Sequence, residues 1–435
     1  MMNKIELKLN PSASCGVIRN ILGMNNSPRI NSAAREASEI ALFKQINPGR
    51  TRYHDPSLEN PGYALINISQ IFPLFHADEN DPRNYNFKAT DYYLSLAASC
   101  GTELEIRLGE DIEHSREHYK VLPPPDPEKW ARICLNIIRH YNEGWADGMQ
   151  LGIRYWCVWE EPDNPKLFDG PYEKYLELYS TVAKAIKKEF PDLKVGGPNT
   201  MGAGDTLEQF FRHCRDTETP VDFAEFTTYT RDPQVLLDRY AKLEKIAREY
   251  GYPNTELCLS ELHYGPLSWD FSIPGVLDSF YNAESAAFTT YIYTKLLDTS
   301  LSMGFYYAWA CSMWGVTKGN GGRVFLPVGH ALSYFAEMAR CKARLMPEIT
   351  NPSDDTAFLC GVTEEGTVKV MVSFFKAHNT DVVFHVPGKT TCRVRRIEDN
   401  EPDPQAVSEL KPREDGSFAV YFEAGGNAVF LFEFA

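Results

Sequence analysis

Two hydrophobic patterns alternate over the first three quarters of the chain. Between about residues 16 and 340, short apolar runs are followed by longer segments in which apolar residues recur every three or four positions. The short runs are typical of buried strands, and the longer spacing is typical of amphipathic helices. Strands that alternate with helices in this way predict a parallel sheet covered by helices.

The helical pattern is clearest in three segments, residues 127–143, 171–190 and 233–250. The first follows Asp126 and opens with Pro127, a pair that favours the start of a helix. In each segment the apolar side chains fall on one stripe, so one face of each helix is expected to pack against the sheet.

Eight apolar runs between and around these helices are candidate strands. They are Val17–Leu22, Arg50–Tyr53, Glu103–Arg107, Gly152–Trp159, Lys194–Gly197, Val221–Tyr229, Glu256–Ser260 and Ser302–Trp309. Eight strands that alternate with helices predict a (β/α)8 TIM barrel, an α/β fold whose chemistry lies at the carboxyl ends of the strands.

After Pro347 the pattern changes to short alternating runs separated by Gly, Asn, Asp and Pro, which is typical of a β-sandwich. The runs are Val368–Phe375, Asp381–Val386, Cys392–Ile397, Ser417–Glu423 and Ala428–Phe434. Apolar residues alternate in the same way at the N-terminus, so this segment is expected to add a strand to the sandwich. The sequence thus predicts a catalytic barrel over residues 16–340 and an accessory β-sandwich domain built from residues 1–15 and 341–435.

The chain carries a net charge of −15 and no long block of Lys or Arg. This charge would repel the phosphates of nucleic acid and an anionic membrane surface, so neither is expected as a partner. No apolar stretch approaches membrane-spanning length, and the first residues lack the apolar run of a signal peptide, which favours a cytoplasmic protein. The 10 cysteines show no CxxC spacing and indicate reduced core residues. The sequence leaves open whether copies of the chain form a homo-oligomer.

Two glutamates stand where apolar strand candidates end, about a hundred residues apart. Glu161 follows the fourth candidate strand and precedes Pro162, which prevents the strand from continuing. Glu261 follows the seventh candidate strand. The carboxyl ends of barrel strands face one pocket, so the two carboxylates are expected to meet there, as a retaining glycosidase requires.

The motifs around these glutamates resemble a known family. Trp159-Glu160-Glu161-Pro162 resembles the Asn-Glu-Pro motif that ends strand four in the large clan of retaining (β/α)8 glycosidases, whose second glutamate ends strand seven. Over nearly its whole length the sequence resembles glycoside hydrolase family 39, which holds β-xylosidases and α-L-iduronidases on a barrel with a β-sandwich. The segments that carry this resemblance are Gly16–Gly23, Thr51–His54, Gly196–Pro198, Asp222–Phe223 with Tyr229, and Gly321–Gly322 through Pro327 to Tyr334.

The resemblance implies a role for each glutamate. Glu161 would be the general acid/base, which gives a proton to the leaving oxygen, and Glu261 would be the nucleophile, which attacks the anomeric carbon. A separation of roughly 5–5.5 Å between the two carboxyls would allow direct attack with retention of configuration. Like charges this close would also raise the pKa of the acid towards the operating pH.

Five further positions are candidates for binding the sugar. His54 at the end of strand two matches a sugar-binding histidine of the family. Tyr229 resembles the tyrosine that hydrogen-bonds the nucleophile, and Trp309 resembles the platform beneath the −1 sugar. His263 and Glu160, which lie close in sequence to the two catalytic candidates, complete the set.

The chain departs from the family at two positions. The asparagine that usually precedes the acid/base is Glu160 here, and a histidine common near strand six is Thr227. Adjacent strand residues face opposite sides, so Glu160 and Glu161 can both enter the pocket only if the strand end is irregular. In the related enzymes the asparagine reaches the 2-hydroxyl of the −1 sugar, so the resemblance implies such an irregular end. Glu160 is therefore expected to accept a hydrogen bond from a substrate hydroxyl and, through its charge, to help keep Glu161 protonated.

Two weaker motifs do not indicate a cofactor. His114 and His118 have the i,i+4 spacing of a helical metal pair, but no glutamate follows the first histidine and no third ligand is evident. Residues 318–322 are glycine-rich without a strand before and a helix after, so a phosphate site is not expected. Neither a metal nor an organic cofactor is therefore predicted.

The expected function is retaining hydrolysis of an oligosaccharide or small glycoside by a β-xylosidase-like exo-glycosidase. The first alternative is a glycosidase for another sugar, such as an α-L-arabinoside, a β-galactoside or a uronide. A uronide carboxylate would need a basic residue, for which Arg52, Arg107 and Arg323 are candidates. The second alternative is a non-hydrolytic carbohydrate-binding barrel, which the changes at Glu160 and Thr227 suggest and the presence of both catalytic candidates argues against.

Overall fold

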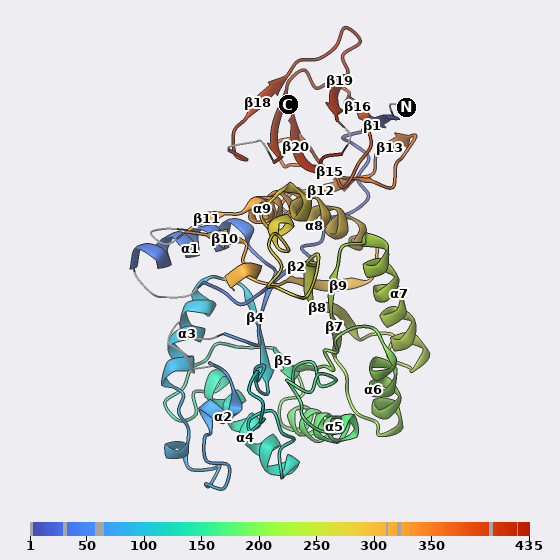
Figure 1. Cartoon of the computed structure of the whole chain (residues 1–435). Helices are drawn as coiled ribbons and strands as arrows, with labels where there is room; N and C mark the ends of the chain where they lie inside the picture. Colours follow the sequence, from blue (N-terminus) through green and yellow to red (C-terminus); the bar gives the residue numbers. More distant parts are fainter. Residues whose placement is uncertain are drawn as a thin grey trace.

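The computed structural model contains a closed barrel of parallel strands with an all-β part stacked on one side of it (Figure 1). The structure describes residues 3–28, 33–56, 65–309, 312–319, 323–399, 403–423 and 425–435. The barrel strands follow one another in chain order, and the last pairs with the first. They are β2 (Leu22–Asn25), β3 (Arg50–Tyr53), β4 (Glu103–Leu108), β5 (Tyr155–Val158), β6 (Lys194–Gly196), β7 (Phe223–Thr230), β8 (Glu256–Tyr264) and β9 (Leu301–Tyr306). The predicted (β/α)8 barrel is confirmed.

Helices surround the barrel (Figure 1). They are α1 (Ala33–Ile46), α2 (Ile68–Ile71), α3 (Lys88–Ser99), α4 (Pro127–Asn142), α5 (Tyr172–Glu189), α6 (Asp205–Asp216), α7 (Pro233–Glu249), α8 (Ala283–Leu296) and α9 (Pro327–Ala339). The start of α4 shows why such a segment folds as a helix. Asp126 accepts a hydrogen bond from the backbone N–H of Lys129 at 3.0 Å, and Pro127 occupies the first turn. The three helices predicted from periodicity correspond to α4, α5 and α7.

Short elements lie in the loops between these helices and strands. They are the 3-10 turns η1 (Pro82–Asn84), η2 (Asp278–Phe280) and η3 (Ser312–Trp314) and the small hairpin of β10 (Thr317–Lys318) and β11 (Val324–Phe325). The glycines at 321 and 322, which contributed to the family resemblance, lie outside the described residues.

The first barrel strand begins later than predicted. The apolar run Val17–Leu22 was expected to form it, but β2 starts only at Leu22. Ile18 and Ile21 are buried without joining the sheet. The Arg19 guanidinium between them donates to three backbone carbonyls near the start of β9, at 2.6–2.9 Å. The apolar pattern here therefore reflects burial beneath the barrel and not strand pairing.

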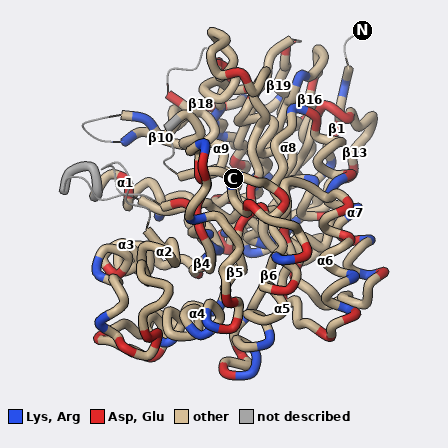
Figure 2. The backbone as a smooth tube through the Cα atoms, turned by 60° about the horizontal axis from the view of Figure 1, so that its bottom comes forward, with Lys and Arg blue, Asp and Glu red and all other residues tan. Residues whose placement is uncertain are grey.

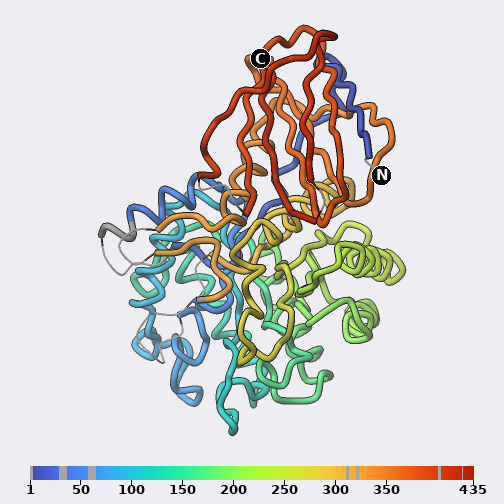
Figure 3. Tube along the Cα trace, turned by 45° about the horizontal axis from the view of Figure 1, so that its top comes forward, coloured from blue at the N-terminus to red at the C-terminus, as the bar shows by residue number. Residues whose placement is uncertain are grey.

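The all-β part consists of two sheets. One has the order β12-β14-β15-β20-β17-β18 and the other β13-β1-β16-β19. The strands are β1 (Asn3–Lys8), β12 (Ala343–Leu345), β13 (Glu348–Thr350), β14 (Thr356–Val362), β15 (Val368–Phe374), β16 (Thr380–His385), β17 (Cys392–Ile397), β18 (Ser408–Leu410), β19 (Phe418–Phe422) and β20 (Ala428–Phe434). The N-terminal strand, blue in Figure 3, lies against the orange and red C-terminal strands. β1 runs parallel to β16, with Ile5 opposite Val382, and the alternating Ile5, Leu7 and Leu9 are buried.

The barrel and the sandwich meet at α8 and α9, which lie between them in Figure 1. The Ser373 hydroxyl of β15 donates to the Thr290 hydroxyl of α8 at 2.6 Å. Arg395 of β17 forms an ion pair with Glu337 of α9 at 2.7 Å. The chain passes from α9 into β12 close to the predicted domain boundary, whose position stays a prediction.

Acidic and basic positions are interspersed along the backbone (Figure 2). Several pair locally on the outer helices, as Arg212 does with Glu208 and Arg248 with Glu244, at 3.0 and 2.9 Å. Among the described residues, no helix combines the length and the apolar character needed to cross a membrane.

Candidate active site

A cavity of about 560 Å³ opens at the carboxyl ends of the barrel strands. Its lining comes from the strands β7 and β8, from the loops that follow β3, β4, β5, β6, β8 and β9, and from α7. The lining residues are His54, Asp55, Ile112, His114, Glu160, Glu161, Asn164, Leu167, Met201, Thr227, Tyr229, Arg239, Glu261, Trp269, Tyr307 and Trp314. Both catalytic candidates thus lie in one cavity, as the sequence predicted.

The end of β5 is irregular, and this irregularity brings two adjacent glutamates into the cavity. The strand stops at Val158, after which Trp159 has φ 70° and Glu161 has φ 33°. Positive φ is uncommon for residues other than glycine and is held here by surrounding structure. The Trp159 indole N–H donates to the carbonyl of Leu167 at 2.6 Å, which anchors the turn. In a regular strand Glu160 and Glu161 would face opposite sides, whereas here both line the cavity.

Glu161 receives hydrogen bonds from two neutral donors. The Thr227 hydroxyl donates to one carboxyl oxygen and the Asn164 side-chain amide to the other, both at 2.9 Å. Burial, and then the negative charge of Glu261, raise the pKa of Glu161 to about 7. A substantial fraction of Glu161 is therefore protonated near neutral pH and can act as a general acid.

A β-bulge directs Glu261 into the cavity. Between β7 and β8, Phe226 lies opposite Leu259 and Thr227 lies opposite Glu261, so Ser260 is an extra residue in β8. The Ser260 carbonyl accepts a hydrogen bond from the Asn25 side-chain amide at 2.8 Å instead. Bulges of this kind re-aim the neighbouring side chain and are frequent beside active sites.

Glu261 is held differently from Glu161, since a fixed positive charge stands beside it. Arg52 lies 3.9 Å from one of its carboxyl oxygens and His54 Nε2 lies 3.0 Å from the same oxygen. The Tyr229 hydroxyl donates a short hydrogen bond to the other oxygen. Burial raises the pKa of Glu261 to about 7, while Arg52 and Tyr229 act in the opposite direction. Because only Glu261 has a cation beside it, we infer that it is the first of the two to ionise.

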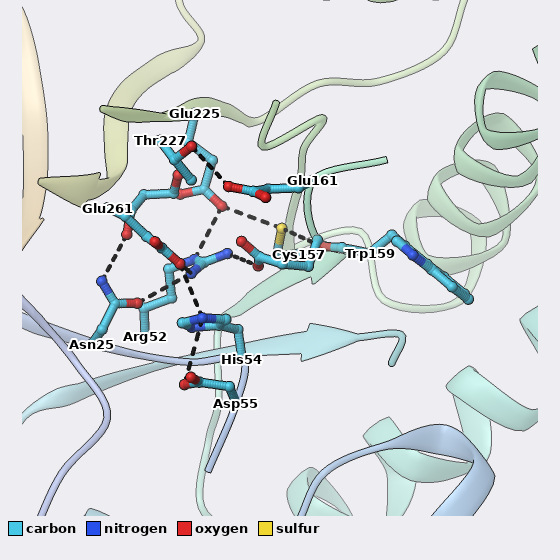
Figure 4. Close-up of polar contacts among 12 residues, drawn as sticks. Asn25, Arg52, His54, Asp55, Cys157, Trp159, Glu161, Glu225, Thr227 and Glu261 are labelled. Carbon is cyan, nitrogen blue, oxygen red and sulfur yellow. Dashed lines mark hydrogen bonds and ion pairs between the residues drawn. The ribbon is translucent and has the colours of Figure 1, made fainter. Parts of the chain in front are cut away.

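Arg52 is the centre of a buried charge network below the cavity (Figure 4). Its guanidinium forms a short ion pair with Glu160 and lies 3.5 Å from Glu225 and 3.6 Å from Glu105. It also donates to the Asn25 side-chain carbonyl at 3.1 Å. All these side chains are almost fully buried, so Arg52 supplies positive charge that solvent cannot.

This network changes the role expected for Glu160. Its charge is balanced by Arg52, and burial raises its pKa while Arg52 and His54 lower it. The charges that raise the pKa of Glu161 most are those of Glu261 and, less strongly, Asp163. The charge of Glu161 raises the pKa of Glu160, but Glu160 is not among the main causes that raise the pKa of Glu161. The structure therefore gives no direct support to the expectation that Glu160 keeps Glu161 protonated. One carboxylate oxygen of Glu160, however, is buried and has no hydrogen-bond partner. Because Glu160 lines the cavity, this oxygen can accept a hydrogen bond from a substrate hydroxyl.

Two of the five sugar-binding candidates lie behind the cavity wall. Trp309 is fully buried, with its ring edge-on to Phe43 at 4.9 Å and its indole N–H 3.3 Å from Glu39. β9 ends at Tyr306, so the chain has turned away from the cavity before it reaches Trp309. The expected role of Trp309 as a sugar platform is not supported by this position.

His263 is also covered. Its ring packs against Phe280 and Trp314, with centroids 4.4 and 5.0 Å away, and Nδ1 lies 2.6 Å from the carbonyl of Tyr264. Burial lowers the pKa of His263 to about 4, so the ring is neutral. The expected contact of His263 with substrate is likewise not supported, because aromatic side chains separate it from the cavity. By contrast, His54, Tyr229 and Glu160 line the cavity as predicted.

Several lining residues were not anticipated from the sequence. Tyr307 donates from its hydroxyl to Asp55 at 2.7 Å, which joins the ends of β9 and β3 across the cavity. Trp269 and Trp314 come from loops. Loop residues follow no hydrophobic period, so only the abundance of aromatics after β8 and β9 could have pointed to them.

Among the described residues, one group of three could offer ligand atoms to a metal ion. His54, Glu160 and Glu261 have such atoms within 4.8 Å of one another. The guanidinium of Arg52 already balances the negative charge of both glutamates. Its positive charge would repel a divalent cation at the same place. His114 and His118, the two histidines with helical metal-pair spacing, are not part of this group. Nδ1 of His118 lies 3.0 Å from a carboxylate oxygen of Asp169.

Comparison with known proteins points to one family. Residues 68–250 match the model of glycosyl hydrolases family 39. The chain is 27% identical over 172 residues to a beta-xylosidase of Geobacillus stearothermophilus, a match that covers 34% of each protein. Over these segments the chain is similar to glycoside hydrolase family 39. A second beta-xylosidase, from Caldicellulosiruptor saccharolyticus, is 32% identical over 120 residues, 26% of this chain and 24% of that protein. The matches thus span about a third or less of each curated relative.

Solved structures resemble the chain over nearly its whole length. A glucosidase from Croceicoccus marinus has a TM-score of 0.78 at 21% identity and covers 100% of this chain and 99% of its own. A monomeric beta-xylosidase from Caulobacter crescentus CB15 has a TM-score of 0.72 at 16% identity, with 99% of both chains covered. At these identities the likeness shows a shared fold.

Proposed function

We propose that this protein is a retaining glycoside hydrolase that cleaves short glycosides by double displacement. The observation that carries the proposal is the unequal environment of two glutamates in one cavity. Glu261 has Arg52 beside it and receives the Tyr229 hydroxyl, which favours its ionised form. Glu161 has only neutral donors and the charge of Glu261 nearby, which favours its protonated form.

The proposed reaction has two steps. Ionised Glu261 attacks the anomeric carbon while protonated Glu161 gives its proton to the leaving oxygen. The resulting ester removes the negative charge of Glu261, so the pKa of Glu161 falls and it can take a proton from the incoming water. Water then releases the sugar with its original anomeric configuration.

The substrate is proposed to be a β-xyloside or a stereochemically similar small glycoside. The two curated relatives are both beta-xylosidases. The polar residues that line the cavity beside Glu261, namely His54 and Glu160, are buried and suit a single sugar held by its hydroxyls. Of the three arginines considered for a uronide carboxylate, Arg52 is committed to Glu160 and Arg323 to Glu39 at 3.0 Å, and Arg107 is not among the lining residues. Arg239 does line the cavity, so an aryl uronide belongs in the substrate panel.

A panel of aryl glycosides tests the proposal. The protein is expected to release the phenol from a β-xyloside and to give β-xylose as the first product, observed by the anomeric proton in NMR. A first product of inverted configuration would contradict the retaining mechanism. Binding without turnover on every sugar would favour the carbohydrate-binding alternative.

The cytoplasmic location and the oligomeric state also remain predictions, to be tested by cell fractionation and analytical ultracentrifugation.

A further inference from the structure

The loop between β8 and α8 is drawn in yellow in Figure 3. It exposes several large apolar side chains. In Leu267–Ile273, apolar and polar residues alternate. Leu267 and Trp269 are each 63% exposed, Phe271 is 43% exposed and Ile273 is 47% exposed. A contiguous exposed apolar surface of this kind is typical of a binding site.

The polar residues of the same loop bond to one another. The Ser268 hydroxyl accepts the backbone N–H of Asp270 at 3.1 Å. One Asp270 carboxylate oxygen accepts both the backbone N–H and the hydroxyl of Ser272, at 3.0 and 2.6 Å. The hydrogen-bonding groups of the loop are thus used to hold its shape, and the surface that it presents outward is apolar.

This apolar surface is continuous with the catalytic cavity. Trp269 lines the cavity and packs edge-on to Tyr229, with ring centroids 5.7 Å apart. Trp314, also in the lining, lies 6.2 Å from Trp269 and 6.1 Å from Phe271 by ring centroids. We call Leu267, Trp269, Phe271 and Ile273, together with Trp314, the aromatic rim.

Burial separates the rim from the catalytic groups. Glu160, His54 and Glu261 are buried, whereas most of the Trp269 side chain meets solvent. The sugar that reacts must reach Glu261, so it occupies the deep end, and its leaving group extends towards the mouth. We propose that the aromatic rim binds this leaving group and that the preferred substrates carry an apolar or aromatic aglycone. This inference rests on the proposed function.

Two β-xylosides with the same sugar test the proposal. Phenol and 2-naphthol are similarly acidic, but 2-naphthol has an additional fused ring to bury. The unmodified protein is expected to favour the 2-naphthyl xyloside by about tenfold in kcat/KM, from the apolar area of that ring. In Trp269→Ala this preference should fall several-fold, mainly through KM, and Phe271→Ala should act in the same direction. Tyr421→Ala, at an exposed aromatic of β19 in the sandwich, is the matched control and should keep the full preference.

Several results would overturn the proposal. An unchanged 2-naphthyl to phenyl ratio in Trp269→Ala would show that the rim does not contact the aglycone. If sedimentation velocity shows that Trp269→Ala dissociates a dimer while the 2-naphthyl to phenyl ratio is unchanged, the rim would be a self-association surface. Failure of the proposed function would look different, since neither xyloside would then be cleaved by the unmodified protein. In that case, calorimetric titration with free 2-naphthol still decides, because binding must be present in the unmodified protein and weaker in Trp269→Ala.

Discussion

At the scale of single residues, the site depends on which neighbour each carboxylate has. Glu161 and Glu261 both have a pKa of about 7 in the free protein, mainly because both are buried. They are distinguished by what else touches them, since Arg52 and Tyr229 favour charge on Glu261. A division of labour between two chemically identical groups therefore arises from their environments alone.

Thr227 stands where the family commonly has histidine, and it offers a direct test of the acid. Its hydroxyl bonds to Glu161 and lowers the pKa of that carboxyl. Thr227→Val keeps the shape and removes the donor, so the pKa of Glu161 should rise. The basic limb of the kcat/KM profile should move to higher pH, with kcat reduced less than about tenfold on an activated aryl glycoside. Thr228→Val, at the next position of β7, serves as the control, and an unmoved limb in Thr227→Val would contradict the assignment.

Glu160 is expected to act on the sugar and not on the acid. Glu160→Gln keeps the side-chain shape but weakens a charged acceptor, so kcat/KM should fall by about ten- to a hundredfold, with a changed preference among glycones. The basic limb of the pH profile should stay in place, because the main charges that raise the pKa of Glu161 are those of Glu261 and Asp163, which this substitution leaves unchanged. Unchanged kinetics on every sugar would instead make Glu160 only a counterion of Arg52.

At the scale of secondary structure, apolar patterns predicted elements well wherever burial and hydrogen bonding coincide. β3, β17 and β20 match their predicted bounds, and the three predicted helices lie within a residue or two of theirs. The first barrel strand was misplaced because Ile18 and Ile21 are buried in an irregular segment. The irregular end of β5 was expected from the family resemblance at Glu160 and Glu161, but its positive φ angles were not. The bulge in β8 was not visible in the sequence, since it is set by the neighbouring strand. These two irregularities are also what aims the catalytic candidates.

The N-terminal strand makes an energetic prediction. Leu7 of β1 is fully buried and lies opposite Phe384 of β16. Leu7→Ala should lower the free energy of unfolding by about 2–4 kcal/mol, through lost burial and the cavity left behind. Lys8→Ala, at an exposed position of the same strand, should change it by less than about 0.5 kcal/mol. Equal urea denaturation midpoints for the two variants would contradict the packing of β1 in the sandwich.

At the scale of the whole molecule, the sandwich packs against the part of the barrel that follows Glu261. β8 holds Glu261, the aromatic rim follows it, and α8 comes next and packs against the sandwich strand β15 through Thr290 and Ser373. The catalytic strand, the loop at the cavity mouth and the second domain are thus consecutive in the chain or in direct contact.

The buried charge network makes stability depend on pH. Burial and the nearby Glu225 raise the pKa of Glu105 from 4.5 to about 8. The folded protein therefore binds the Glu105 proton more tightly than the unfolded chain does. The stabilisation of the fold by this protonated carboxyl is complete below about pH 4.5 and is lost as the pH rises through about 8. Glu105→Gln mimics the protonated form. Between pH 6 and 9 the free energy of unfolding should fall less in Glu105→Gln than in the unmodified protein. The difference between the two decreases should be on the order of a few kcal/mol. Parallel pH profiles from urea denaturation would contradict this.

The most direct test of the central claim is the configuration of the product formed when azide replaces each glutamate. Glu261→Ala should lower kcat on an aryl glycoside by on the order of ten-thousandfold or more, and azide should restore turnover to give a glycosyl azide of inverted configuration. Glu161→Ala should still form the glycosyl-enzyme from an activated aryl glycoside, and azide should give the retained product. The anomeric proton coupling in NMR distinguishes the two. Azide products of the same configuration from both variants, or full activity in either one without azide, would contradict the assignment of Glu261 as nucleophile and Glu161 as acid/base.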